Sequence, residues 1–116
     1  MAKRMTIAMW VVSGLLAALF LAAGGMKLSG AQEAIETFRR YGYPQWFRFL
    51  IGAIEAGGAL LLLIPRAALY SATALGVVMI GAAYTHLMNS EVSHAPLPIL
   101  LLIVLAFIGY ARRTAA

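Results

Sequence analysis

The sequence predicts an all-α integral membrane protein: a four-helix transmembrane bundle with a short interfacial amphipathic helix between spans 1 and 2, in one domain covering residues 1–116. Hydrophobic residues make up 63% of the chain and charged residues 11%, against about 45–50% and about 25% in soluble domains. Polar segments separate four apolar runs, and the first of them is long enough to cross roughly 30 Å of hydrocarbon. Because small soluble domains bury only about 60% of their unfolded surface, lipid must cover much of this chain.

The first apolar run covers residues 5–26 and contains no charged residue. Lys3 and Arg4 precede it, as basic residues also precede the apolar region of a signal peptide. That region is only about 7–15 residues long, however. We therefore expect residues 5–26 to be a retained transmembrane helix.

A more polar segment follows, in which apolar side chains recur at helical spacing over residues 31–41. Gly42 and Pro44 end this pattern. The segment is typical of an amphipathic helix that lies in the membrane interface. Aromatic residues that would lie at head-group depth surround its end: Tyr41, Tyr43 and Trp46.

The remaining spans are predicted at residues 46–64, 67–87 and 95–111. Pro65 and Arg66 form a very tight connection, so the second and third spans must be antiparallel neighbours. Arg48 lies near the start of its span, where its side chain can snorkel outward. Small residues four positions apart would let the helix backbones approach closely, in the pairs Gly52/Ala56, Ala53/Gly57 and Ala72/Gly76.

The basic residues favour an orientation with both termini in the cytoplasm (N-in/C-in), because Lys and Arg are enriched in cytoplasmic loops. On that side the chain would place Lys3, Arg4, Arg66, Arg112 and Arg113. The first loop weakens the bias, since it holds Lys27, Arg39, Arg40 and Arg48. The compact design fits a bacterial inner (cytoplasmic) membrane. The sequence contains no basic stripe with interleaved aromatic residues outside the apolar runs, so it does not indicate binding to nucleic acid.

Glu55 is the most informative polar position, because it lies near the centre of the second span. Placing a charged group at that depth in the bilayer costs at least a few kcal/mol of free energy. The Glu55 side chain should therefore face the bundle interior. It is the candidate catalytic residue, as a carboxyl that handles protons or anchors a ligand. The alternative is a structural hydrogen bond to a neighbouring helix.

Other polar residues complete a set of ligand-binding candidates: Lys27, Glu55, Tyr84, His86, Arg39 and Arg40. Lys27 can snorkel to the surface, unless Gly24 and Gly25 bend the helix and turn its amine inward. By helical rise, Glu55 and His86 lie at different depths. We therefore expect a polar gradient, with Lys27, Tyr84 and His86 near the outer mouth, and not a compact triad.

The absence of cysteine excludes thiol redox chemistry, iron–sulfur ligation and c-type haem attachment within this chain. His86 and His94 have no carboxylate at ligand spacing, which gives no strong metal signal. We expect no metal and no intrinsic cofactor.

Several stretches together resemble the DoxX/DoxX-like family of small four-span membrane proteins. They are residues 14–27 (GLLAALFLAAGGMK), 42–46 (GYPQW), 52–55 (GAIE), 62–66 (LLIPR), 79–86 (MIGAAYTH) and 110–112 (YAR). The resemblance implies association with a quinone-linked redox system or with redox-stress assemblies, or a chaperone-like role. Lys27, Glu55 and His86 match polar positions of the family pattern, and the resemblance assigns none of them a catalytic role.

Three hypotheses for function follow. The first is a membrane subunit or scaffold that positions a partner redox protein through residues 31–41. The second is a binding module for quinone or another lipid-like small molecule. The third is a proton-coupled redox enzyme or a transporter that uses Glu55, for which a homodimer would build a larger path.

Overall fold

The protein is described by a computed structural model that covers residues 3–114. Its elements are α1 (Lys3–Ser29), α2 (Gln32–Arg40), α3 (Gln45–Leu62), α4 (Ala68–Met88), the short 3-10 helix η1 (Val92–His94) and α5 (Pro96–Arg112). Four segments are long and apolar enough to cross a membrane: α1, α3, α4 and α5 together with η1. The predicted fold class is confirmed. α1 continues three residues beyond the predicted end at Met26, to Ser29.

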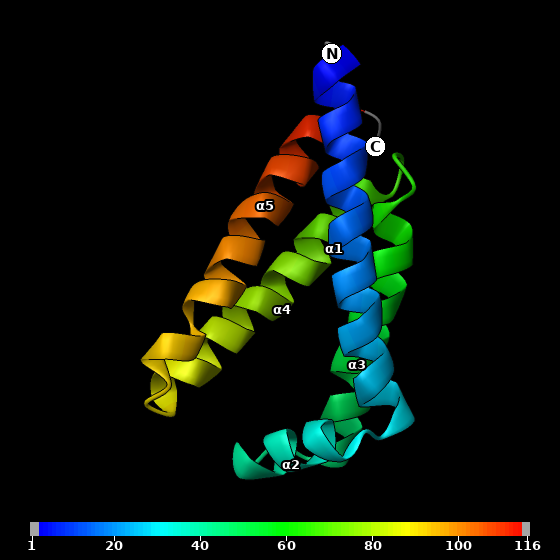
Figure 1. Cartoon of the computed structure of the whole chain (residues 1–116). Coiled ribbons are helices and arrows are strands. Elements are labelled where there is room, and N and C mark those ends of the chain that lie inside the picture. Colours follow the sequence, from blue (N-terminus) through cyan, green and yellow to red (C-terminus); the bar gives the residue numbers. More distant parts are fainter. Residues whose placement is uncertain (1–2, 115–116) are drawn as a thin grey trace.

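Two glycines set the position of α2. Gly30 and Gly42 lie on either side of it with φ values of 77° and 81°, a left-handed conformation that glycine adopts without steric cost. The chain therefore turns sharply before and after α2, which lies across one end of the bundle (Figure 1). Pro96 begins α5, a position where the missing N–H leaves no helical hydrogen bond unmade.

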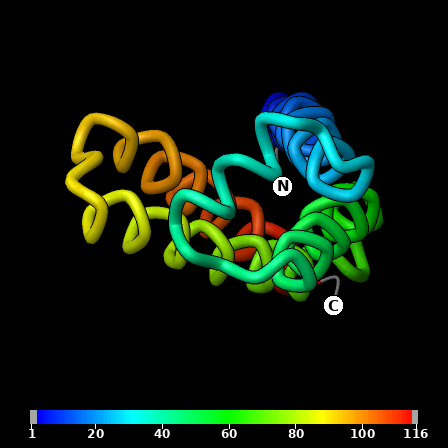
Figure 2. The backbone as a smooth tube through the Cα atoms, turned by 90° about the horizontal axis from the view of Figure 1, so that it is seen from below, coloured from blue at the N-terminus to red at the C-terminus, as the bar shows by residue number. Residues whose placement is uncertain are grey.

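The four long helices form two pairs. α1 packs along α3, α4 packs along α5, and α3 and α4 join the pairs. The pairs lean apart toward the end where α2 lies (Figure 1). Seen from below, α2 crosses the space between them (Figure 2).

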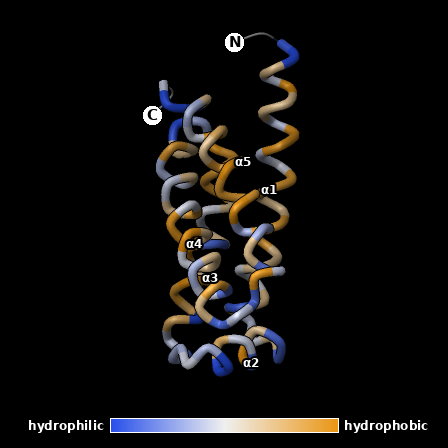
Figure 3. Tube along the Cα trace, turned by 90° about the vertical axis from the view of Figure 1, so that its left-hand side faces the viewer, coloured by the Kyte–Doolittle hydropathy of each residue, from blue (hydrophilic) through white to orange (hydrophobic). Residues whose placement is uncertain are grey.

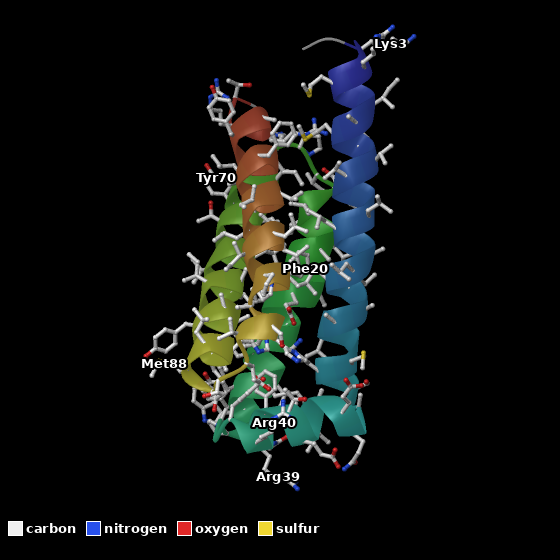
Figure 4. All side chains as sticks on the ribbon, turned by 60° about the vertical axis from the view of Figure 1, so that its left-hand side comes forward. Lys3, Phe20, Arg39, Arg40, Tyr70 and Met88 are labelled. Carbon is white, nitrogen blue, oxygen red and sulfur yellow. The ribbon has the colours of Figure 1, made fainter. Side chains whose placement is uncertain are left out.

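Apolar side chains from all four long helices make the core, and Phe20 of α1 is among the largest (Figure 4). Large apolar side chains also cover the outside, where Leu15 is 68% and Ile103 is 61% exposed. Hydrophobic residues fill the middle of the helices and hydrophilic ones gather at both ends (Figure 3). An apolar exterior on this scale is suited to lipid.

Two of the three predicted small-residue pairs lie in helix contacts. Gly52 and Ala56 meet Gly24 of α1, and Ala72 lies beside Gly109 of α5. The pair Ala53/Gly57 was wrongly predicted to pack, because Ala53 is exposed and a methyl group on Gly57 would meet nothing within 4 Å. α1 approaches only one side of α3, so one small-residue face is sufficient.

Candidate functional site

Lys27 and Glu55 form an ion pair between α1 and α3, with 2.7 Å between Nζ and Oε1. The Glu55 side chain is 5% exposed and the Lys27 side chain 20%. The prediction that Glu55 faces the bundle interior is confirmed. Lys27 does not snorkel to the surface, and it does not join the outer residues of the expected gradient. Its amine turns inward, as the alternative proposed.

Close packing of the two backbones brings the pair together. A methyl group on Gly24 would lie 2.6 Å from the backbone N of Ala56 and 2.7 Å from the carbonyl O of Gly52. Lys27 follows Gly24 by three residues and Glu55 follows Gly52 by three, so each charged residue lies on the face that its glycine brings into contact. The helix is continuous through Gly24 and Gly25. Close approach therefore places the amine.

Glu55 lacks part of its usual hydrogen bonding. Its Oε1 is buried, and its partner among the described residues is the Lys27 ammonium, 2.7 Å away. A carboxylate has about four acceptor sites on its two oxygens, and one ammonium occupies only part of them. Glu55 is therefore able to accept a further hydrogen bond.

A cavity of about 730 Å³ opens beside this pair. α3 and α4 form its walls, and α2 with the following turn closes one end. Apolar side chains line most of it, among them Phe38, Leu50, Ile54, Val77, Val78 and Met79. Leu50, Val77 and Tyr84 are 46%, 64% and 63% exposed, so the cavity wall continues onto the outer surface of the helices.

A second polar group lies at the α2 end of the same cavity; we call Arg40, Tyr41, His86 and Glu91 the rim network. The Tyr41 hydroxyl donates to Oε1 of Glu91 at 2.5 Å and lies 3.3 Å from Nδ1 of His86. Nδ1 of His86 is 3.1 Å from the same Glu91 oxygen, and Arg40 reaches Oε2 of Glu91 at 3.5 Å. These contacts connect the end of α2 to the end of α4.

The contacts shift the acid–base properties of the rim network. Hydrogen bonds from Tyr41 and His86 lower the pKa of Glu91. Burial, followed by the hydrogen bond to Glu91, raises the pKa of Tyr41. The hydrogen bond to Tyr41 and the charge of Glu91 raise the pKa of Arg40. Glu91 is therefore a carboxylate and Tyr41 a neutral hydroxyl over a wide pH range.

Sequence reasoning missed Glu91. Its position in the sequence could have identified it as a candidate site residue. Glu91 is the only acidic residue that follows Glu55 in the sequence, and it lies five residues after His86. Tyr43 and Thr85 were also missed, although both line the cavity and their hydroxyl oxygens lie 2.6 Å apart. Such pairs depend on how the turn after α2 meets α4, and local patterns do not contain that information.

Arg48 does not snorkel outward as predicted. Its residue is 4% exposed, Nε donates to Oε1 of Gln45, and Nη1 donates to the carbonyl oxygen of Lys27. The last carbonyls of a helix have no intrahelical partner and carry partial negative charge. The guanidinium therefore satisfies the end of α1, which explains its burial.

The other predicted site residues take no part in these clusters. Arg39 is exposed and points away from the bundle (Figure 4). Tyr84 lines the cavity with its ring mostly exposed. The His94 ring lies 5.6 Å from that of His86. Within residues 3–114, no three His, Asp or Glu side chains are grouped in a way that could hold a metal ion.

Four spanning helices define a multi-pass α-helical membrane protein, and its candidate site is a lateral apolar cavity with a buried ion pair in its wall. The chain belongs to the DoxX-like family, whose family model matches residues 11–108. The resemblance seen in the sequence is thereby confirmed. The chain is also similar to the uncharacterized protein YdgD of Bacillus subtilis (strain 168). The two are 35% identical over 81 residues, which cover 66% of this chain and 71% of YdgD. No solved structure matches the chain.

Proposed function

We propose that the chain is a membrane binding protein for a lipid-like small molecule with a polar head group, such as a quinone. The observation that carries this proposal is the cavity of about 730 Å³ with the Lys27–Glu55 pair in its wall. Binding sites for small molecules are typically about 300–1,000 Å³, mostly apolar, with a few polar groups that orient the ligand.

The polar groups suit a head group that carries carbonyl or hydroxyl oxygens. The Lys27 ammonium can donate to a carbonyl oxygen, and the Glu55 carboxylate can accept from a hydroxyl group. The pair can therefore hold an oxidised or a reduced head group without a change in its own charge. The Tyr41 hydroxyl and His86 offer further polar contacts at the α2 end.

The partly exposed wall suits an apolar tail. Leu50, Val77 and Tyr84 belong both to the cavity and to the surface of the spanning helices. A tail could leave the cavity between α3 and α4 and remain in hydrocarbon. The scaffold hypothesis has less support, because the apolar face of α2 is already occupied within the chain: the buried Phe38 packs against Tyr43 and Phe47 at the cavity. Only the polar side of α2, around Arg39, remains for a partner.

Native mass spectrometry of protein extracted in mild detergent tests the proposal. We expect a stoichiometric bound small molecule in the wild type, and a reduced amount in Glu55→Gln. Arg39→Gln, which changes an exposed residue outside the cavity, should retain it. Absence of any bound molecule, including after incubation with a short-tailed quinone, would contradict the proposal.

A variant that fills the cavity tests ligand binding while leaving the Lys27–Glu55 ion pair unchanged. Ala82→Phe introduces a ring into the cavity wall, whereas Ala83→Phe adds the same ring at a neighbouring position that does not line the cavity. We expect loss of the bound molecule in the first variant and retention in the second. Equal retention in both would mean that the molecule binds elsewhere.

We further propose that both termini face the cytoplasm of a bacterial cell. Support comes from the basic residues beside the start of α1 and the end of α5, which lie at the same end of the bundle (Figure 1). Reporter tags fused to the two termini should both report the cytoplasm. Two tags that report the opposite side would overturn the orientation.

A further inference from the structure

The charged residues are distributed unequally between the two ends of the molecule. All four acidic residues lie in α2, in α3 or in the turn after α4: Glu33, Glu36, Glu55 and Glu91. Four basic residues in the same part offset them: Lys27, Arg39, Arg40 and Arg48. The formal charge of +5 therefore comes from the five remaining basic residues, which belong to the other end.

We call that other end the terminal end; it consists of the start of α1, the α3–α4 turn and the end of α5 (Figure 1). Its basic residues are Lys3, Arg4, Arg66, Arg112 and Arg113. Among residues 3–114, none of the five forms a salt bridge. All except the half-buried Arg112 are exposed. Within the described part of the chain, the terminal end is thus a cationic surface whose basic residues have no acidic partner.

Aromatic rings hold two of these cations in place. The Arg112 guanidinium lies 4.8 Å from the centre of the Trp10 ring and connects α5 to α1. The Arg113 guanidinium lies 3.8 Å from the centre of the Tyr110 ring, and its Nη1 donates to the Tyr110 carbonyl at 2.6 Å. A ring covers the face of a guanidinium and leaves its edge, which carries the N–H donors, available to a partner.

From this arrangement we propose that the terminal end binds the head groups of anionic phospholipids, with its centre at Arg112 and Trp10. A guanidinium edge matches a phosphate group with two parallel hydrogen bonds. Trp10 and Tyr110 are 44% and 66% exposed, and Trp and Tyr side chains are typical of the level where head groups meet hydrocarbon. Exposed apolar residues of the same helices, such as Val11 and Phe107, continue toward the membrane interior and suit the acyl chains.

The test uses nanodiscs that contain equal amounts of phosphatidylglycerol and phosphatidylcholine, followed by native mass spectrometry of the lipids that stay bound. Wild type should retain phosphatidylglycerol in preference. Arg112→Gln should weaken this retention about fivefold, the effect of one basic residue near an anionic surface. Arg39→Gln makes the same change at the opposite end and should have no effect.

Two further variants keep the test decisive if Arg112→Gln is poorly folded. Arg113→Gln changes an exposed side chain and should also weaken retention. Arg112→Lys keeps the charge but loses the planar donor edge, so it should fall between wild type and Arg112→Gln. Equal retention of the two lipids, or the same loss in Arg39→Gln, would overturn the proposal.

Inorganic phosphate separates a lipid site from a phosphate site. At constant ionic strength, phosphate should displace phosphatidylglycerol only weakly, because it offers no acyl chain to the helices. Full displacement by millimolar phosphate would overturn the assignment to lipid. Because the terminal end lies opposite the cavity, failure of this proposal and failure of the proposed cavity ligand are independent results.

Discussion

Two polar groups lie on the same cavity, and they are built differently. Lys27 and Glu55 meet between α1 and α3, whose backbones touch at Gly24 and Gly52. The rim network meets between the end of α2, the end of α4 and the turn that follows it, and side chains alone make its hydrogen bonds. One group is therefore positioned by helix packing, and the other joins the end of α2 to the end of α4 through side chains.

The difference in surroundings has an energetic consequence. The Glu55 side chain is 5% exposed, whereas the Glu91 side chain is 23% exposed. Charges removed from water lose hydration and depend on each other, while partly hydrated charges keep water as an alternative partner. Changes at the inner pair should therefore have large effects, and changes at the rim network should have smaller effects that depend on pH.

The largest effect is expected when one member of the inner pair is removed. Lys27→Met leaves the buried Glu55 carboxylate without a counter-charge, which should cost about 3–5 kcal/mol in the free energy of unfolding. Glu55→Leu should cost a similar amount, because it strands the ammonium. The measurement is equilibrium unfolding in mixed detergent micelles.

The double variant shows whether the loss comes from the pair. Lys27→Met with Glu55→Leu removes both charges, and replacing a whole buried pair by apolar residues is often neutral. We expect most of the lost stability to return. If the two single losses simply add, the side chains act independently, and the ion pair does not carry the energy assigned to it.

A second prediction concerns the packing that places the pair. Gly24→Ala introduces a methyl group 2.6 Å from the backbone N of Ala56, so α1 and α3 must move apart. Overpacking of this kind lowers the free energy of unfolding by about 1–3 kcal/mol. Thermal unfolding of the purified protein measures this loss of stability.

Gly25→Ala is the matched control, since its methyl group would meet nothing within 4 Å. Alanine is also favoured over glycine within a helix by roughly 0.5–1 kcal/mol. The control should therefore be as stable as wild type or slightly more stable. Equal destabilisation by both variants would show that α1 does not approach α3 through Gly24.

Features that repeat along one segment were predictable, and features that depend on two distant segments were not. Four apolar runs gave the four helices, and one acid inside a run identified Glu55 as an inward-facing residue. The partner of Glu55 depends on the register between α1 and α3, which Gly24 and Gly52 determine together. Arg48 was mispredicted for a similar reason, because its partner is the end of another helix.

The smallest predicted effect is a pH dependence of the rim network. Because the folded-state pKa of Glu91 is lowered, its stabilising contribution is complete above the unfolded value of about 4.3 and is lost as pH falls through the folded value. Tyr41 has a raised pKa, so its contribution is complete below about pH 10 and is lost as pH rises through the folded value. The contacts between α2 and α4 should therefore loosen at both extremes.

Hydrogen exchange of the amides in α2, followed by mass spectrometry over the pH range and corrected for intrinsic rates, measures this loosening. Glu91→Gln should remove the dependence on the acid side, and Tyr41→Phe the dependence on the alkaline side. Glu36→Gln is a suitable control, because Glu36 bonds only to Gln32 within α2 among the described contacts. Unchanged pH profiles in the first two variants would show that packing of Phe38 holds α2 without the rim network. In that case the cavity would be closed at this end by apolar contacts alone.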